Sequence, residues 1–320
     1  MGISEARCDV LVAGAYFADL IFRELPRTVA VGRETFAGGF EMLPGGAFNP
    51  AMALHRLGDD VVWATDFGND EFSRHVLAGV RAAGLSESGF RHHPQPVRSV
   101  TVALSYTADR AMVSFQDPVT PRPVDELVRV HRPRVLVLPE LRYGPGVVET
   151  LRAVREAGTS IFMDCQDVPV TLETPTVREV LACVDVFAPN VDEALRLTGA
   201  ATPDDAATLL GELVSTVLIK RGKHGAIALR AGNRIAVPAA PVRVVDTTGA
   251  GDCFNAGFVH GLLAGWDLPR SLAAAVACGS AAATAPGSGG ALDADELSAW
   301  LAPAEPVPPL RGTQLEHHPW

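Results

Sequence analysis

Apolar runs with the length of a strand alternate with helical patterns along most of the chain. The runs lie between loops that contain polar residues or glycine, and they read DVLVAGA (9–15), RVLVLPE (134–140), SIFMDC (160–165), VDVFAPN (184–190) and STVLIKRG (215–222). Unbroken hydrophobicity of this length is typical of strands buried on both faces. Amphipathic helical patterns lie between the runs, for example at 47–58, 71–84, 146–158, 191–199 and 204–214. The alternation predicts an α/β fold with a doubly wound, mostly parallel central sheet and helices on both faces.

Two regions, 20–43 and 97–117, do not follow this order of apolar runs and helical patterns. In them, single apolar and polar residues alternate. Alternation with a period of two is typical of strands that have one exposed face. These regions therefore predict a small separate β-sheet, a lid that elaborates a single domain spanning 1–302. The proline-rich segment 303–320 is expected to be a C-terminal tail.

Charge and cysteine content exclude several classes of protein. Lys and Arg number 27 against 37 Asp and Glu, a net charge of −10, and no basic run could follow a phosphate backbone, so a nucleic-acid partner is not expected. The five cysteines lie far apart without a C-x-x-C pair, which argues against disulfides and structural zinc and favours a reducing, cytoplasmic location. The chain start lacks a basic n-region, and the Ala-rich stretch 271–290 is expected to be a packed helix and loop, so no membrane association is expected.

A glycine-rich stretch, DTTGAGDCFNAGF (246–258), precedes an apolar run where a helix is expected to begin. It matches neither the P-loop nor the dinucleotide-binding pattern. Gly249 and Gly251 permit a close turn, and the free amides of a helix starting at about Asp252 would attract an anion. Asp252 would repel that anion unless the carboxylate takes a proton from an attacking hydroxyl. An acidic cap at the helix start explains the same spacing equally well, so spacing alone leaves both interpretations open.

The sequence D-T-T-G-A-G-D followed by F-x-A-G-F resembles the C-terminal signature of the ribokinase-like (PfkB) family of carbohydrate kinases. Further segments resemble family motifs in the same order along nearly the whole chain: GAYFADL (14–20), PGGAFNPAMALHRLG (44–58), FGNDEFS (67–73), PNVDE (189–193) and KRGKHG (220–225). The resemblance implies an enzyme, an ATP-dependent phosphotransferase that acts on an alcohol group, usually of a sugar. It also implies Mg²⁺ and often a stimulating monovalent cation such as K⁺.

The resemblance implies roles at the reacting groups for the residues of the C-terminal signature. Asp252 would be the general base for the acceptor hydroxyl. The amides of Gly249, Ala250 and Gly251 would form an anion hole for the charge that develops on the phosphoryl group. These roles agree with the demands of phosphoryl transfer, which depends mainly on positioning and charge stabilisation.

On the acceptor side, the resemblance implies that Asp19, in the loop after the first strand, binds sugar hydroxyls. Gly45, Gly46 and Asn49 of the second motif would add further contacts, and Glu140 matches a position that contacts substrate in some members. The residues alone also fit another interpretation, in which Asp19 is a turn or cap residue, the glycine pair makes a tight turn with Asn49 capping the helix, and Glu140 is a solvated strand-end side chain. The family usually places three residues between the glycine pair and the asparagine, whereas this chain has two, so the resemblance does not extend to ribose as the acceptor.

On the nucleotide side, Asn190 and Glu193 match the N-x-x-E motif that the family uses near Mg²⁺ and the phosphates, with Glu193 acting on the metal indirectly. The same spacing also fits an ordinary capped helix start. The remaining nucleotide-binding residues that the resemblance implies are Lys220, Gly222, Gly225 and Thr248. Lys220 replaces the threonine that is usual in the family. Asp246 and the loop 285–290 match segments that hold a monovalent cation.

These patterns favour a carbohydrate kinase that moves the γ-phosphoryl group of ATP to a hydroxyl of a sugar or sugar-like small molecule. The alternatives are a nucleoside kinase of the same family and a catalytically silent ligand-binding protein on the same fold. The small sheet would be marginal alone, so we expect its apolar face to be buried by substrate or by a second subunit. This predicts a homodimer formed through the lid.

Overall fold

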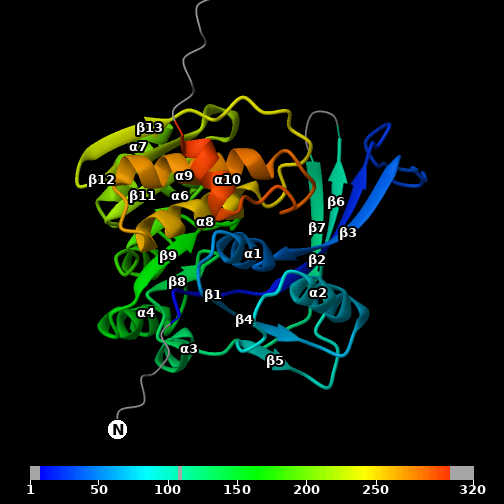
Figure 1. The fold of residues 1–320 in the computed structure, drawn as a ribbon, viewed down its shortest axis with the longest axis horizontal. Coiled ribbons are helices and arrows are strands. Elements are labelled where there is room, and N and C mark those ends of the chain that lie inside the picture. Colours follow the sequence, from blue (N-terminus) through cyan, green and yellow to red (C-terminus); the bar gives the residue numbers. More distant parts are fainter. Residues whose placement is uncertain (1–7, 107–109, 303–320) are drawn as a thin grey trace, which may run out of the picture.

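A nine-stranded sheet forms the centre of the molecule within residues 8–106 and 110–302, which are the residues that the computed structural model describes (Figure 1). The strand order is β13-β12-β11-β10-β9-β8-β1-β4-β5, and the strands from β11 to β5 all run parallel. The mostly parallel central sheet is therefore confirmed. The predicted tail at 303–320, and 107–109 of the predicted lid, lie outside the described residues.

All five apolar runs form strands of this sheet: β1 (Val10–Ala13), β8 (Val135–Leu138), β9 (Ser160–Asp164), β10 (Val186–Ala188) and β11 (Thr216–Lys220). Two further parallel strands extend one edge, namely β4 (Val61–Phe67) and β5 (Phe90–His92). An antiparallel hairpin that the sequence patterns did not predict extends the other edge, made of β12 (Ala226–Arg230) and β13 (Asn233–Val237).

Helices cover both faces of the sheet because side chains alternate along each strand. Val10 and Val12 point into one apolar core, and Leu11 and Ala13 point into the other. The first core is closed by α1 (Phe48–Arg56), α2 (Glu71–Ala82), α8 (Ala250–Leu263), α9 (Leu268–Ala282) and α10 (Ala294–Leu301). The second is closed by α3 (Val124–His131), α4 (Val147–Glu156), α5 (Val177–Leu181), α6 (Val191–Thr198) and α7 (Pro203–Gly211). Within the described residues, no helix has both the length and the apolarity needed to span a membrane.

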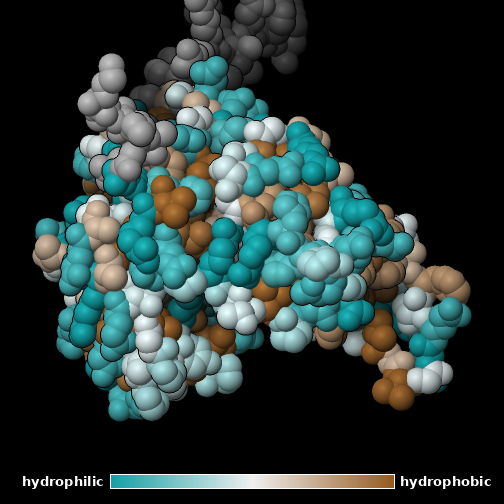
Figure 2. Space-filling view, turned by 90° about the horizontal axis from the view of Figure 1, so that it is seen from below, coloured by the Kyte–Doolittle hydropathy of each residue, from teal (hydrophilic) through white to brown (hydrophobic). Residues whose placement is uncertain are grey.

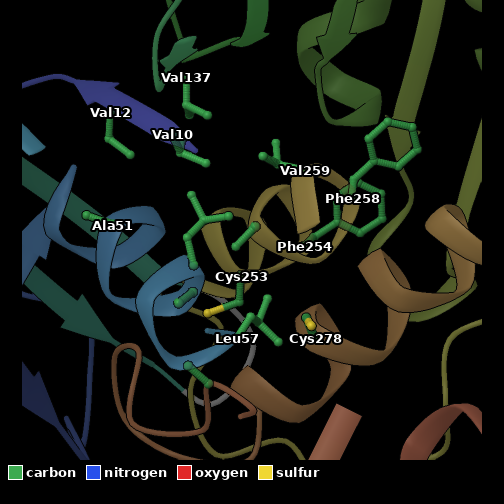
Figure 3. Packing of buried hydrophobic residues seen from close by; sticks show 14 of the residues in the cluster. Val10, Val12, Ala51, Leu57, Val137, Cys253, Phe254, Phe258, Val259 and Cys278 are labelled. Atoms are coloured by element: carbon green, nitrogen blue, oxygen red, sulfur yellow. The ribbon is translucent and has the colours of Figure 1, made fainter. Parts of the chain in front are cut away.

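Helix α8 is held closely between the sheet, α1 and α9. Figure 3 shows Val259 of α8 directed at the sheet and Cys253 directed at α1, with Cys278 of α9 nearby. At Gly257 the two helices α8 and α9 meet, because a Cβ atom there would lie 2.7 Å from the Ala274 carbonyl oxygen and 2.9 Å from the Cys278 Sγ. This tight packing fixes the position of the first turn of α8.

A second, four-stranded sheet within the described residues forms the lid, in the order β3-β2-β6-β7. Its strands are β2 (Tyr16–Arg23), β3 (Gly39–Gly46), β6 (Ser99–Ser105) and β7 (Arg110–Gln116). The lid projects from the body at the right of Figures 1 and 2. The predicted small sheet is therefore confirmed, although β2 begins earlier and β3 ends later than the range 20–43.

The prediction that Asp19 lies in a loop is wrong. Asp19 is in the middle of β2, where it pairs with Leu43 of β3 and Thr101 of β6. The chain breaks only briefly at Gly14 and then continues extended from the central sheet into the lid. β2 of the lid therefore follows β1, an inner strand of the central sheet, after only two residues.

The pairing register places a continuous row of apolar side chains on the lid face opposite to Asp19. These side chains are Leu20, Phe22, Phe40, Val102, Val113 and Phe115. Helix α2 covers the base of this face, where a Cβ atom at Gly79 would lie 2.5 Å from Pro44 Cγ. The outer part stays exposed, with exposed fractions of 54% for Phe40 and 69% for Val113. Figure 2 shows brown, hydrophobic side chains on this projecting arm.

We expect Gly257→Val to lower the free energy of unfolding by about 1 to 3 kcal/mol or more, because the new side chain would collide with the backbone of α9. Urea unfolding measures the change. Ala264→Val is the matched control, since Ala264 is exposed at the end of the same helix and its replacement should stay within about 0.5 kcal/mol of the wild type. Equal losses in both variants would contradict the tight contact.

Candidate active site

Polar side chains gather at one edge of the central sheet, where the parallel strands end. Glu140 follows β8, Asp164 ends β9, Asn190 follows β10 and Lys220 ends β11. The carboxyl ends of neighbouring parallel strands meet at the same edge, which is where open α/β sheets bind their ligands. The strand order therefore brings together residues that lie up to 80 positions apart, from Glu140 to Lys220.

A cavity of about 730 Å³ opens beside this edge. Its wall includes Gly46, Glu140 and Asp252 of the predicted site, and the lid contributes Phe17 and Ser99. The cavity thus lies between the body and the lid, within the size range of small-molecule sites. It joins two predicted acceptor residues, Gly46 and Glu140, to the predicted base, whereas Asp19, Gly45 and Asn49 are not among the residues that line it.

Asp252 lies in the first turn of α8 and reaches this cavity. The helix begins at Ala250, two residues before the predicted start, because Gly249 adopts a left-handed conformation (φ 74°) that turns the chain directly into the helix without a side-chain cap. Burial raises the pKa of Asp252 to about 7, and the neighbouring Asp164 adds to the increase. The carboxyl group therefore titrates near neutral pH.

Asn49 contacts Asp252 from α1, and its Nδ2 lies 3.3 Å from the Asp252 Oδ2. The alternative that Asn49 caps the helix is wrong, because α1 begins at Phe48 after an Ala47 cap that has no side-chain hydrogen bond. Asn49 is only 3% exposed, yet its Oδ1 has no hydrogen-bond partner among the described residues. A buried amide oxygen without a partner is costly, so this atom is suited to accept a hydrogen bond from a ligand.

Asp19 packs directly over Gly45 of the neighbouring strand. A Cβ atom at position 45 would lie 2.0 Å from the Asp19 Oδ2, so no other residue fits without moving the carboxylate. Gly46 has a φ of 63°, and a Cβ atom there would lie 2.7 Å from the Ala15 carbonyl oxygen. The glycine pair thus ends β3 within the strand and not in the tight turn that was the alternative interpretation.

Lys220 forms a buried ion pair with Asp164, with its Nζ 2.7 Å from each carboxylate oxygen. The exposed fractions of the two side chains are 14% and 8%. Burial by itself lowers the pKa of Lys220, but Asp164 and Glu193 more than offset this and raise it. A Cβ atom at Gly251 would lie 3.5 Å from the Lys220 Nζ, so the ammonium group lies against the first turn of α8.

Asn255, one turn after Gly251, completes this network. Its Nδ2 donates to the Asp164 Oδ2 at 2.5 Å. Neither Asp164 nor Asn255 was predicted to belong to the site. The position of Asp164 at the end of an apolar strand was a usable signal, because the same strand-end argument places Lys220. Asn255 lies within an apolar helical run and carries no signal of its own.

Asn190 and Glu193 form a reciprocal capping box at the start of α6. The Glu193 amide donates to the Asn190 Oδ1 at 2.9 Å, and the Asn190 amide donates to the Glu193 Oε2 at 2.7 Å. The capped helix start is therefore present, and it fixes both side chains beside Lys220. Burial, assisted by Asp164, raises the pKa of Glu193 to about 7.

The remaining predicted residues shape the loops around this edge. Asp246 accepts hydrogen bonds from the Thr248 amide (3.0 Å) and hydroxyl (2.9 Å) through Oδ1, and from the Gly287 amide (3.0 Å) through Oδ2. It therefore ties the loop before α8 to the loop 285–290. Gly222 (φ 52°) opens the short 3₁₀ turn after β11, and a Cβ atom at Gly225 would lie 1.9 Å from the Val237 carbonyl oxygen.

The described part of the chain contains no group of three or more His, Cys, Asp or Glu side chains arranged to hold a metal ion. All five cysteines lie within it as buried thiols, and none of them forms a disulfide.

Comparison with known proteins places this geometry in a family. Residues 9–295 match the profile of the family described as pfkB family carbohydrate kinase. The ribokinase of Bacillus subtilis (strain 168) is 26% identical over 283 residues, which cover 82% of this chain and 89% of that protein. The bifunctional protein HldE of Pseudomonas putida (strain GB-1) is 27% identical over 245 residues, which cover 72% of this chain. This chain spans 50% of the length of that bifunctional relative.

Solved structures share the fold. The ribokinase of Arabidopsis thaliana, complexed with ribose and ATP, superposes with a TM-score of 0.78 at 22% identity and covers 92% of this chain and 98% of its own. A putative ribokinase II from E. coli, in complex with ATP and Mg²⁺, superposes with a TM-score of 0.75 at 22% identity and the same coverage. These likenesses confirm the predicted ribokinase-like fold, with its central sheet and small lid sheet.

We expect the stability gained by Asp252→Asn to grow as the pH rises from 5 to 8. An unfolded Asp titrates near pH 3.9, so the folded wild type binds more protons than the unfolded chain between pH 4 and 7 and loses stability as the pH rises through this window. The Asn variant lacks this loss, and each pKa unit corresponds to about 1.4 kcal/mol.

Urea unfolding of both proteins at pH 5 and pH 8 measures the difference. Asp192→Asn is the matched control, because Asp192 is exposed on α6 and its replacement should change stability equally at both pH values. A gain that is constant or that shrinks toward pH 8 would show that Asp252 is not stabilised in its protonated form.

Proposed function

This chain belongs to the pfkB family of carbohydrate kinases, and on that premise we propose that it transfers the γ-phosphoryl group of ATP to a hydroxyl of a sugar bound in the cavity beside Asp252. The observation that carries the proposal is the position of Asp252, which lies at the amino end of α8 and also lines the cavity between body and lid. A base and an anion-binding helix end thus face the same space.

Asp252 acts as the general base in this proposal. The acceptor oxygen forms a bond to the γ-phosphorus while the bond from that phosphorus to the bridging oxygen of ADP breaks, and the hydroxyl proton moves to Asp252. ADP leaves with the bonding electron pair. A pKa of about 7 supports the role, because the group is then partly ionised at neutral pH and is a stronger base than an ordinary Asp.

The amides of Gly249, Ala250 and Gly251 form the anion hole. Helix N-termini offer amides without an intrahelical partner and a positive dipole end, both of which stabilise negative charge. The Ala250 amide donates to the Thr247 carbonyl oxygen at 3.3 Å, so this long hydrogen bond would be exchanged for one to a phosphoryl oxygen. The Lys220 ammonium adds positive charge behind the same turn, which is its role at the nucleotide in this proposal.

The acceptor is held by Asp19, Asn49, the backbone of the glycine pair and Glu140. The unpartnered Asn49 Oδ1 supports this role most directly, because a sugar hydroxyl can donate to it. Gly46 and Glu140 both line the cavity, and Asp19 is held in place over Gly45. A nucleoside is the second acceptor class to test, since a cavity of about 730 Å³ has room for a base attached to the sugar.

ATP and Mg²⁺ are the cofactors in this proposal, as the complexes of the structural relatives suggest. Asn190 and Glu193 lie at the strand edge that would face the phosphates, where Glu193 would act on Mg²⁺ through water. Gly222, Gly225 and Thr248 would shape the nucleotide side of the site. Both oxygens of Asp246 already accept hydrogen bonds, so a K⁺ ion would be held mainly by backbone carbonyls of the loops that Asp246 joins.

The exposed apolar face of the lid supports a homodimer formed through this sheet. Phe40, Val113 and Phe115 are each more than half exposed, although a small sheet needs a covered face to be stable.

Five buried thiols without a disulfide support a reducing, cytoplasmic location.

We expect Asp252→Asn to lower kcat by about 10² to 10⁴ with little change in ATP binding, because general-base catalysis contributes about that factor.

Asp19→Ala is the contrasting variant. It should raise the acceptor KM by about tenfold or more, since it loses charge-assisted hydrogen bonds of about 1.5 to 3 kcal/mol each.

A coupled assay of ADP release, run over a panel of sugars and nucleosides, measures both effects, and calorimetry measures ATP binding. Asp192→Asn is again the control and should match the wild type. Wild-type turnover by the Asp252→Asn variant would refute the base, and weaker ATP binding in the Asp19→Ala variant with an unchanged acceptor KM would refute the acceptor pocket.

We expect Val113→Asp to convert the homodimer to a monomer, because it places a charge on the exposed apolar face of the lid. Ser114→Asp is the matched control, since the next residue of the same strand points to the opposite face. Light scattering after size-exclusion chromatography gives the mass of each protein. A monomeric wild type with full activity would remove the dimer from the proposal.

A further inference from the structure

Two arginines, Arg122 and Arg142, line the same cavity as Asp252. Arg142 follows β8 by four residues, and Arg122 precedes α3. No motif of the sequence pointed to either of them. Arginine side chains are uncommon in the wall of a partly buried cavity unless they bind something, because burying a guanidinium without a partner is costly.

The partners of Arg142 leave most of its donors uncommitted. Its Nη2 donates to the Ala13 carbonyl oxygen at 2.8 Å. Its Nε lies 3.6 Å from the Glu140 Oε1, which is an ion pair but too long for a hydrogen bond, and the Glu140 side chain is 47% exposed. A guanidinium has five N–H donors in a planar fork. Several donors can therefore serve a ligand in the cavity.

The charge of Arg142 is also poorly compensated. Its side chain is 23% exposed, and burial lowers its pKa while the distant carboxylate of Glu140 only partly opposes this. The group remains protonated because an arginine does not lose its proton in proteins. The folded chain thus holds a desolvated positive charge whose carboxylate partner, Glu140, is 3.6 Å away and about half exposed.

Arg122 brings a second guanidinium group to the lining of this cavity. Its Nη2 donates to the Gly89 carbonyl oxygen, and burial lowers its pKa as well. The nearby carboxylate of Asp66 already accepts hydrogen bonds from Arg91 and from His93, the latter at 2.7 Å. Asp66 therefore cannot fully neutralise Arg122.

A further carboxylate that lines the cavity, Asp117, is equally committed. It forms a two-pronged ion pair with Arg98, with distances of 2.8 and 3.0 Å. The cavity therefore offers two incompletely paired guanidinium groups, although the whole chain carries a net charge of −10. Two arginines with donors left over, lining one cavity, are a local feature that a neutral ligand does not require.

We propose that the acceptor sugar carries an acidic group, a carboxylate or a phosphate ester, which Arg142 binds while Arg122 adds attraction. This inference rests on the proposed function, because it assigns the substrate class of the same site. The planar fork of arginine matches both acidic groups, each of which can accept two parallel hydrogen bonds. The acidic group lies at the Arg142 end of the cavity, and the acceptor hydroxyl points toward Asp252.

The test compares neutral and acidic acceptors that differ at one carbon. D-Glucitol and D-gluconate form the carboxylate pair, and D-fructose and D-fructose 6-phosphate form the phosphate pair, within a wider panel of neutral sugars, sugar acids and sugar phosphates. ADP release gives kcat/KM for each compound, and calorimetry gives its binding to the enzyme without ATP. We expect the best acceptor to be acidic, with a kcat/KM at least about tenfold above that of its neutral counterpart. Comparing the two pairs shows whether a carboxylate or a phosphate is preferred.

Four variants test which residues cause the preference for an acidic acceptor. Arg142→Gln should raise the KM of the acidic acceptor by at least about tenfold without changing that of a neutral one, and Arg142→Lys should recover part of the loss. Arg122→Gln gives an independent, smaller loss and keeps the test open if Arg142→Gln fails to fold. Arg129→Gln is the control, because Arg129 is an exposed residue of α3 paired with Asp125 outside the cavity.

The outcomes separate this inference from the proposed function. Preferred turnover of a neutral sugar, or an equal loss for neutral and acidic acceptors in the Arg142→Gln and Arg122→Gln variants, overturns the acidic acceptor and leaves the kinase intact. No turnover of any compound overturns the proposed function. In that case calorimetry tests the acidic acceptor without turnover. Tighter binding of acidic than of neutral compounds, lost in the Arg142→Gln variant, supports the inference. Equal binding of acidic and neutral compounds refutes it.

Discussion

The buried ion pair between Lys220 and Asp164 is the interaction on which the geometry of the site depends. It joins the ends of β9 and β11, and through Asn255 it also holds α8 in the turn after its start. Buried carboxylates and ammonium groups are stable only when they are paired and hydrogen-bonded. Without Lys220, the carboxylates of Asp164 and Asp252 would share one buried space without a cation, so the turn and the charges would change together.

This ion pair also explains why two carboxyl groups titrate near neutral pH. Asp252 and Glu193 both lie close to the pair, and for both of them burial raises the pKa to about 7 while Lys220 acts in the opposite direction. The pKa values of both groups therefore depend on the same two neighbours, Asp164 and Lys220. The charges of the whole cluster, more than the charge of any single residue, set the electrostatic environment at the first turn of α8.

Sequence patterns predicted the fold well because the central sheet depends on apolar runs that are buried on both faces. The motifs also pointed to residues that the fold brings to one edge of the parallel sheet, among them Lys220 and Asp252, although their roles remain predictions. Sequence reasoning failed where the contact is tertiary: Asp164 and Asn255 meet only after folding, and Asn49 becomes a buried contact of Asp252 because Ala47, and not Asn49, caps α1. Arg142 had no motif, because its significance comes from the cavity and not from its neighbours in sequence. The roles of the individual site residues still await their tests.

The course of β2 has a thermodynamic consequence. The strand starts two residues after β1 of the central sheet, presents Asp19 on one face and places Leu20 and Phe22 on the other. A ligand that contacts Asp19 and a protein that covers the opposite face therefore act on the same strand. Linkage requires such effects to be reciprocal. Suppose that subunit pairing through this face favours one arrangement of the strand and that the sugar binds this arrangement more tightly. The sugar then strengthens pairing by the same factor by which pairing strengthens sugar binding. The lid would then make enzyme concentration itself a determinant of acceptor affinity.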